Sequence, residues 1–256
     1  MAADLETEGI ALYAISYDPP EVLADFAERH GITYPLLSDA GSELIRELGI
    51  LNEEAMERAQ GIPHPGVFLL DADGTIAETH FYESYRERDT GAGLLEQVLG
   101  IAAAHDGPQT QVASDVVQLQ AGFDSPNYVW GQRLWLTVSL TIAEGYHVYG
   151  RPIPAGYIPL EIEIEPLERV TVGPARWPTS EPFQVEGLDE QFQVFSGEVR
   201  VSLPITFMTV DAGELALSGR VTLQACTATE CLMPDSLSFE LRLPEAPLVE
   251  RPQRRD

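Results

Sequence analysis

The stretch Leu134-Trp-Leu-Thr-Val-Ser-Leu-Thr-Ile142 places an apolar residue at every second position. A strand with this pattern turns one face to a core and the other to solvent, because successive side chains point to opposite faces. The same period of two recurs in the runs 117–121, 161–165, 199–203, 221–225 and 237–243. Two packed antiparallel sheets require several strands of this kind. We therefore predict an all-β, immunoglobulin-like sandwich over residues 113–243.

The first part of the chain has a different pattern. Residues 9–16 form a continuous apolar run of strand length, which predicts a strand covered on both faces. Pro19 and Pro20 suit the first turn of a helix, and Gly31 marks its end. Further expected elements are strands at 34–37, 67–70 and 75–81, and helices at 42–48, 53–59 and 91–104. Alternating strands and helices indicate an α/β domain.

The change of pattern near residues 105–111 divides the 256-residue chain in two. Two cores of roughly 100 to 140 residues each lie within the usual range for domains. We predict an α/β domain at 1–106, the sandwich at 113–243, and a frayed tail at 244–256, which holds three prolines and little to bury.

Composition excludes several classes of function. The net charge is −26, and all fifteen basic residues are Arg, so no basic stripe is available to neutralise phosphates of nucleic acid. No stretch approaches the ~20 apolar residues that a transmembrane helix needs. The opening residues lack the basic and apolar regions of a secretory signal. We predict no nucleic-acid partner and no membrane span, and the oligomeric state stays open.

The two cysteines, Cys226 and Cys231, are separated by four residues and flanked by strand patterns. They are expected to face each other across a tight hairpin, at a separation that a disulfide tolerates. Closing so short a loop stabilises a fold by only about 2 kcal/mol, so a reversible redox pair is favoured over a structural disulfide or two unlinked thiols. The His residues at 30, 64, 80, 105 and 147 form no metal-ligand pattern. We predict no metal and no cofactor.

The segment Leu223-Gln-Ala-Cys-Thr-Ala-Thr-Glu-Cys-Leu-Met-Pro234 resembles the signature Tyr-Gln-Ala-Cys-x₄-Cys-x-x-Pro of the N-terminal domain of thiol:disulfide interchange proteins of the DsbD family. Gly145-Tyr-His-Val-Tyr-Gly150, with Gly156-Tyr-Ile-Pro-Leu160 behind it, resembles that domain's Gly-x-His-x-Tyr stretch. The resemblance spans roughly 113–243 and implies an immunoglobulin-like sandwich whose cysteines relay electrons, with Cys226 and Cys231 as the exchanging pair. Leu223 replaces the family's frequent Tyr, and the membrane domain that supplies electrons in that family is absent.

Residues 9–104 resemble the AhpC/TSA branch of thioredoxin-like proteins. The matching pieces begin at Ala14-Ile-Ser-Tyr-Asp-Pro-Pro, Gly61-Ile-Pro-His-Pro-Gly and Phe81-Tyr-Glu-Ser-Tyr. The resemblance implies a catalytic Cys, or selenocysteine, on a helix before the strand at 9–16. The catalytic strand and most of that helix, both of which precede residues 9–16, are missing, and no Cys precedes Cys226, so we expect an incomplete domain whose true start lies upstream of Met1. A degenerate scaffold is the alternative.

Other residues invite a functional interpretation. Pro65 and Gly66 precede a predicted strand where thioredoxin-like folds place a cis-proline, although an ordinary turn fits equally well. A second group is expected to be solvated surface rather than a site: Tyr82, Tyr85, Arg86 and Arg88. His147, together with Tyr149, belongs to the sandwich motif and is expected to pack rather than to catalyse.

The sequence as a whole predicts a thiol–disulfide oxidoreductase or electron relay that uses Cys226 and Cys231 and exchanges with a protein thiol or disulfide partner. Such chemistry suits a periplasmic or other oxidising compartment. One alternative is a non-catalytic binding module in which the cysteines form a structural disulfide. Another is a peroxidase-type enzyme whose active Cys or selenocysteine lies upstream of Met1.

Overall fold

A computed structural model describes residues 2–55, 59–82, 88–100, 106–184, 191–209 and 213–246. The chain divides into two compact units, Met1–Ile101 and Ala102–Asp256. The predicted domain limits at 106 and 113 stay predictions. The tail predicted at 244–256 lies mostly outside the described residues. Its described part is Pro244, Glu245 and Ala246.

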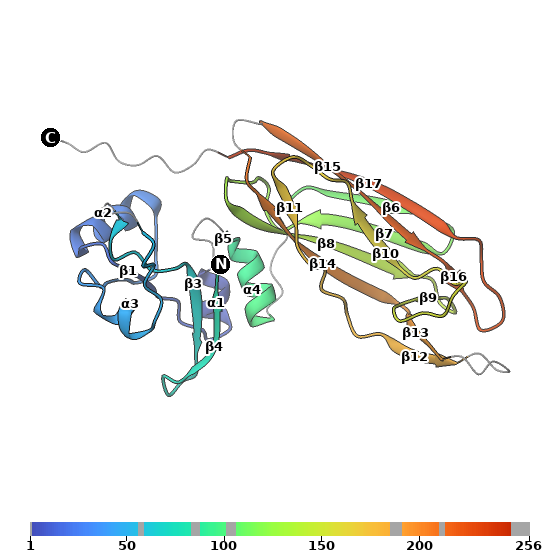
Figure 1. Ribbon diagram of the computed structural model, residues 1–256, viewed down its shortest axis with the longest axis horizontal. Coiled ribbons are helices and arrows are strands. Elements are labelled where there is room, and N and C mark those ends of the chain that lie inside the picture. The colour runs from blue at the N-terminus through green and yellow to red at the C-terminus, as the bar shows by residue number, and fades with distance from the viewer. Residues whose placement is uncertain are drawn as a thin grey trace. The chain divides into compact units, whose positions relative to one another are not determined.

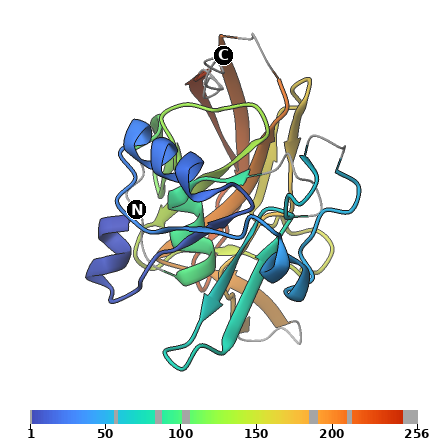
Figure 2. The same cartoon turned by 90° about the vertical axis from the view of Figure 1, so that its left-hand side faces the viewer.

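The first unit combines short strands with helices (Figure 2). Its helices are α1 (Ala2–Thr7), α2 (Pro20–His30), α3 (Glu43–Glu47) and α4 (Gly91–Leu99). Its strands are β1 (Ala14–Ser16), β2 (Leu36–Ser38), β3 (Gly66–Leu70), β4 (Ile76–Phe81) and β5 (Arg88–Asp89). β1 and β2 pair in parallel, whereas β3 and β4 form an antiparallel hairpin.

Helix α2 forms where the sequence predicts it, although Pro19 stands at its N-cap position rather than in its first turn and no side chain caps the helix there. Pro20 occupies its first turn, where an amide donor is not needed, and Gly31 ends it with a left-handed φ of 61°. The predicted strand at 9–16 is wrong in extent, because β1 begins only at Ala14. Its residues are also half-buried rather than covered on both faces. The predicted helix at 53–59 lies partly outside the described residues.

In its described residues, the second unit consists of β-strands joined by turns and loops. Its strands are β6 (Gln109–Ala113), β7 (Val117–Phe123), β8 (Gln132–Ile142), β9 (His147–Tyr149), β10 (Glu161–Ile164), β11 (Val170–Val172), β12 (Glu181–Gln184), β13 (Gln191–Phe195), β14 (Glu198–Phe207), β15 (Glu214–Leu223), β16 (Ala225–Cys226) and β17 (Asp235–Pro244). One sheet has the order β11-β14-β8-β7-β6, and a second has the order β10-β15-β17 (Figure 1). The pairs within both sheets are antiparallel.

The core of this unit lies between the two sheets. β17 alternates between exposed and buried residues from Ser236 onward, and it contributes Phe239 and Leu241 to the core. β8 supplies Leu136 and Leu140 to the same core. The alternation that the sequence shows at 134–142 and 237–243 is therefore the alternation of inward and outward side chains in a sandwich.

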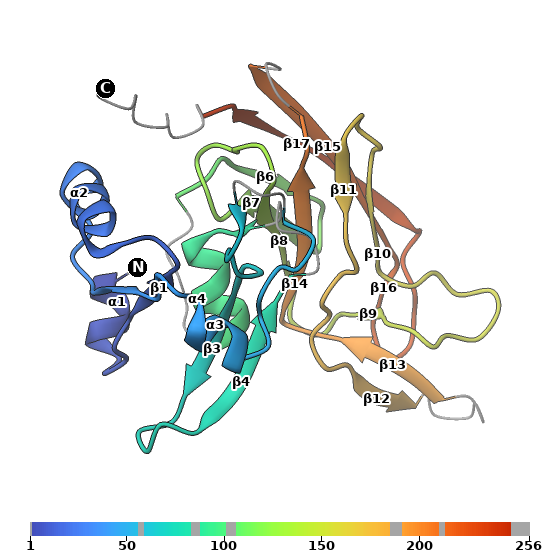
Figure 3. The ribbon, with the colours of Figure 1, turned by 60° about the vertical axis from the view of Figure 1, so that its left-hand side comes forward.

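A third, smaller sheet carries the cysteines. Its order is β12-β13-β9-β16, and its pairs are antiparallel. Figures 1 and 3 place this sheet at one end of the sandwich, where β9 and β13 lie side by side. The short strand β16 continues from β15 after a single residue, Gln224, so the chain passes from the core sheet directly into the small sheet.

Candidate functional site

The two cysteines lie on a tight hairpin that Thr227 organises. The amide of Thr227 donates to the carbonyl of Glu230 at 2.8 Å, and the Thr227 hydroxyl accepts from the amides of Thr229 and Glu230. At the base of the hairpin, the amide of Leu232 donates to the carbonyl of Ala225 at 2.9 Å. These bonds hold the chain on both sides of the turn in a fixed register, as is common for hydroxyl-bearing turn residues.

Cys226 and Cys231 are opposed across this hairpin and joined by a disulfide. Their Cα atoms are 4.0 Å apart, so the predicted juxtaposition of the pair is present in the structure. The two residues differ in burial: Cys226 is 0% exposed, whereas Cys231 is exposed to solvent. A macromolecule that approaches the disulfide therefore meets Cys231 first.

Strand β9 places two motif residues against the disulfide. Cys226 is paired with His147 across the sheet, and Ala225 is paired with Val148. Two residues further along β9's sequence motif, the hydroxyl of Tyr149 lies 3.5 Å from Sγ of Cys231. A disulfide sulfur has no proton to give, so the Tyr149 hydroxyl is the donor in this contact.

Aromatic side chains surround the buried side of the pair. Tyr149, Phe192, Val194 and Cys226 form a cluster of buried residues that is separate from the main core. The ring of Tyr149 lies 5.1 Å from that of Phe192 and 5.3 Å from that of Tyr157. This wall excludes water from Cys226, because the cluster leaves that residue without exposed surface.

The two polar motif residues are both held in their neutral forms near neutral pH. Burial raises the pKa of the Tyr149 hydroxyl, and the nearby Tyr157 adds to the shift. Burial lowers the pKa of His147. Nε2 of His147 is buried without a hydrogen-bond partner, and the ring packs 4.2 Å from that of Phe183. Tyr149 thus remains a hydrogen-bond donor, and His147 contributes no positive charge beside the disulfide.

Sequence reasoning singled out His147 and Tyr149 but did not find the rest of the aromatic wall. Phe192 and Tyr157 join the cluster through tertiary packing. The signal that was available for Phe192 is the alternation in Gln191-Phe-Gln-Val194, which places two apolar side chains on one face of β13. For Tyr157 the signal is its place in Gly156-Tyr-Ile-Pro-Leu160, the stretch that accompanies the Gly-x-His-x-Tyr motif.

The other candidate residues are far from the cysteines in the sequence and belong to the first unit. The cis peptide bond of the described chain is Arg151–Pro152, and the bond before Pro65 is not cis. The carbonyl of Pro65 accepts a hydrogen bond from the amide of Tyr82 at 3.1 Å, and the Tyr82 hydroxyl bonds to Asp89. Tyr85 and Arg86 lie outside the described residues, so the prediction of a solvated surface remains a prediction.

Within the described residues, no three His, Cys, Asp or Glu side chains come together as a metal site would require. His105 lies outside these residues. No helix in the described part of the chain has the length and apolar character that crossing a membrane demands.

Comparison with known proteins divides the chain in the same way. Residues 116–243 match the family described as "Thiol:disulfide interchange protein DsbD, N-terminal", and residues 1–79 match the AhpC/TSA family. Both expected resemblances are therefore confirmed, as is the fold class: a thioredoxin-like AhpC/TSA region followed by an immunoglobulin-like β domain. Both families act in thiol-based redox chemistry, which supports redox exchange in general terms.

Curated relatives include peroxiredoxins, whose matches cover about a third of the chain. A putative peroxiredoxin of Mycobacterium tuberculosis (strain CDC 1551 / Oshkosh) is 36% identical over 80 residues, covering 30% of this chain and 50% of the relative. Peroxiredoxin Bcp of Escherichia coli (strain K12) is 32% identical over 84 residues, covering 32% of this chain and 53% of the relative. The chain spans about half the length of the curated relatives it matches.

Solved structures match the second part at low identity. The N-terminal periplasmic domain of ScsB from Proteus mirabilis shares 20% identity at a TM-score of 0.39, over 54% of this chain and 52% of that one. The reduced DsbD N-terminal domain of Neisseria meningitidis shares 17% identity at a TM-score of 0.32, over 54% of this chain and 84% of that one.

Proposed function

Since the chain belongs, through residues 116–243, to the family of the DsbD N-terminal domain, we propose that it performs thiol–disulfide exchange with a protein partner through Cys226 and Cys231. The observation that carries the proposal is the unequal exposure of the pair: Cys231 faces solvent and Cys226 is buried. These are also the two cysteines of the chain, so any exchange by its own residues uses them.

The unequal exposure supports a defined order of steps. In the reduced protein, the Cys231 thiolate attacks one sulfur of a partner disulfide, and the other partner sulfur leaves as a thiolate. The buried Cys226, as a thiolate, then attacks Sγ of Cys231 and releases the second partner sulfur. Two electrons pass from the protein to the partner, and the two thiol protons end on the partner's thiols. The reverse sequence reduces the protein, and neither direction requires a cofactor.

Two neighbours of the pair assist this chemistry. The Tyr149 hydroxyl, 3.5 Å from Cys231 Sγ, would donate to the thiolate that attacks or leaves. The aromatic wall around Cys226 keeps small thiols in solution away from that sulfur. The partner that fits these steps is a protein with its own dithiol or disulfide, in a compartment where disulfides persist.

The alternative is that the disulfide serves only to stabilise the fold. The cysteines are five positions apart, and closing so short a loop contributes only about 2 kcal/mol to stability. The buried core of the sandwich is large by comparison, with more than twenty buried apolar residues. A staple of this size adds little to such a core, which favours exchange over stabilisation as the use of the pair.

The test is the reduction potential of the Cys226–Cys231 couple in the whole chain. Purified protein is equilibrated with dithiothreitol or glutathione buffers, and free thiols are trapped and counted. A reduction potential well above about −300 mV supports exchange, because the disulfide is then readily reduced. A couple that stays oxidised below that value identifies a structural disulfide, and the chain would then be a non-catalytic binding module.

A further inference from the structure

A pocket of about 410 Å³ opens beside the cysteine hairpin. It lies between the turn that joins β6 to β7 and the segment that leads from β15 through the hairpin into β17. Its lining residues are Ser114, Asp115, Val116, Leu223, Ala225, Leu232, Met233, Pro234 and Asp235. All of these residues belong to the second unit.

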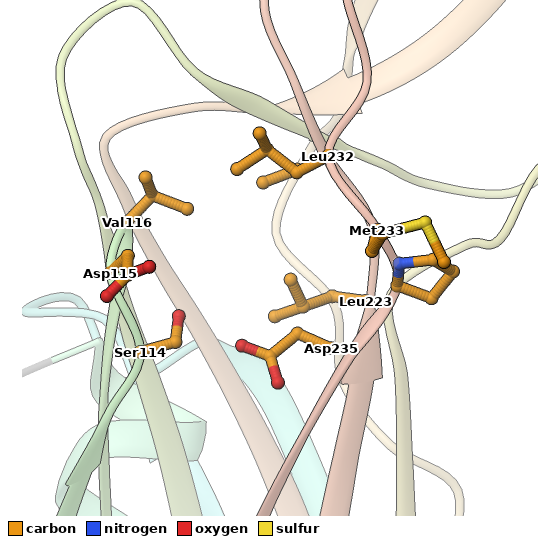
Figure 4. Close-up of a pocket in the computed structure, with 9 residues that line it drawn as sticks. Ser114, Asp115, Val116, Leu223, Leu232, Met233 and Asp235 are labelled. Carbon is orange, nitrogen blue, oxygen red and sulfur yellow. The ribbon is translucent and has the colours of Figure 1, made fainter.

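The pocket has an apolar part and an anionic part (Figure 4). Val116 and Leu232 point into the gap from opposite walls, and Met233 lies on the rim with 85% of its surface exposed. The carboxylate of Asp235 points across the gap toward the wall that carries Ser114 and Asp115. No basic residue is among those that line the pocket.

The walls of the pocket are fixed by backbone bonds. The amide of Ser114 donates to the carbonyl of Val117 at 2.8 Å, which closes the β6–β7 turn. On the other wall, Leu232 is held by its bond to Ala225 and by the side chain of Gln224, whose Nε2 donates to the Leu232 carbonyl at 3.0 Å. A pocket formed by such constrained turns is present before a ligand arrives.

The pocket is lined by residues next to the two cysteines in the chain. Ala225 precedes Cys226 and Leu232 follows Cys231, so two pocket residues are the chain neighbours of the two cysteines. Alternation of side chains directs Cys226 to the aromatic cluster and Ala225 to the opposite face. Because Leu232 directly follows the exposed Cys231, a peptide joined to Cys231 that runs along the chain toward Leu232 would reach the pocket.

We propose that this pocket receives an arginine side chain of the protein that exchanges disulfides with Cys231. The inference rests on the proposed function. The aliphatic stem of an arginine would pack against Val116, Leu232 and Met233, while its guanidinium would pair with the carboxylates of Asp115 and Asp235. A net charge of −26 on the chain further favours a basic partner segment over an acidic one.

The experiment uses the reduced, full chain and three short synthetic peptides. Each peptide carries one cysteine in a mixed disulfide with thionitrobenzoate, and they differ at one neighbouring position: arginine, citrulline or norleucine. The Cys231 thiolate attacks the peptide disulfide and releases coloured thionitrobenzoate. Cys226 then attacks Sγ of Cys231, which forms the disulfide of the chain and releases the peptide thiol. The measured quantity is the rate for each peptide divided by the rate for the citrulline peptide.

The wild-type chain should react faster with the arginine peptide than with citrulline, by about twofold to fivefold for each partly exposed ion pair. The preference should disappear in about 1 M salt, where the Debye length is only about 3 Å. Asp235→Asn and Asp115→Asn should each lower it. Asn at 235 keeps an oxygen for the bond that Asp235 accepts from the Ser236 amide at 2.7 Å.

Glu144→Gln is the matched control. Glu144 is exposed and lies one residue after Ala143, whose amide donates to the carbonyl of Val116, but it does not line the pocket. This variant changes the net charge by the same amount and should retain the arginine preference. An equal loss in Glu144→Gln would assign the preference to overall charge and overturn the pocket.

The remaining outcomes separate the two proposals. If no peptide releases thionitrobenzoate, exchange itself fails. If all peptides react at the same rate, exchange stands and the arginine site is refuted. A norleucine peptide that reacts as fast as the arginine peptide would show an apolar subsite without a role for the carboxylates, which also overturns the inference.

Discussion

Replacing Tyr149 with Phe removes one oxygen atom next to the cysteine that is proposed to attack the partner. The hydroxyl lies 3.5 Å from Cys231 Sγ, and the side chain is only 2% exposed, so water cannot readily replace it. Hydrogen bonds to charged groups contribute about 1.5–3 kcal/mol, and a long bond to sulfur should be worth less, about 1 kcal/mol. Tyr149→Phe should therefore leave the fold intact while making the thiolate harder to form.

A loss of about 1 kcal/mol lowers the thiolate population about fivefold at a fixed pH below its titration. The thiolate that remains is more basic and intrinsically more nucleophilic, by about twofold for a Brønsted coefficient of 0.4–0.5. The net result is an attack rate about twofold to threefold lower near neutral pH. At alkaline pH, where the thiol is ionised in both proteins, the variant should match or exceed the wild type.

The assay is stopped-flow reaction of the reduced chain with a small aromatic disulfide from pH 5 to 10. Tyr157→Phe is the control, because the Tyr157 ring lies 5.3 Å from that of Tyr149 and packs against the same cluster. This control should keep the wild-type profile. A Tyr149→Phe profile that superposes on the wild type at every pH would refute the role of the hydroxyl, as would an equal slowing in Tyr157→Phe.

Three further predictions follow from burial and packing. Cys226→Ser should accumulate a mixed disulfide with a partner at the exposed Cys231, whereas Cys231→Ser should trap little, because Cys226 is 0% exposed; equal trapping on non-reducing gels would contradict the proposed order of attack. Burial lowers the pKa of His147, so its neutral form stabilises the fold above the unfolded value of about 6.5, and that stability is lost as the pH falls below it. His147→Phe should therefore lose less stability than the wild type between pH 7.5 and pH 5 in urea titrations, and parallel losses would count against it. Gly219→Ala should destabilise the sandwich by about 1–3 kcal/mol, because its Cβ would lie 2.4 Å from the ring of Phe239; an unchanged unfolding midpoint would show that the ring can move aside.

The sequence predicted much of the architecture because those features depend on neighbours in the chain. The alternation at 134–142 and 237–243 became β8 and β17, since the direction of a side chain in a strand depends only on its position. Pro20 and Gly31 marked the ends of α2 through their own backbone preferences. The opposition of Cys226 and Cys231 followed from a turn of four residues.

The strand predicted at 9–16 shows where local pattern is insufficient. A continuous apolar run predicts burial on both faces, but burial depends on what packs against the strand. In the described chain β1 comprises Ala14–Ser16 and pairs with β2, and the neighbouring Tyr13 is 60% exposed. Hydrophobicity indicates what a segment can bury and does not determine what covers it.

What the sequence by itself determined is the chemistry that is available: two cysteines at a hairpin spacing, in a chain without Lys and with strong negative charge. Only the tertiary structure decided how the two cysteines differ. The burial of Cys226 depends on β9 and on Phe192 of β13, and the Tyr149 hydroxyl reaches Cys231 across 82 positions of the chain. The pocket likewise joins Ser114–Val116 to Leu223–Asp235. Such contacts arise from the packing of distant segments, and no local propensity encodes them.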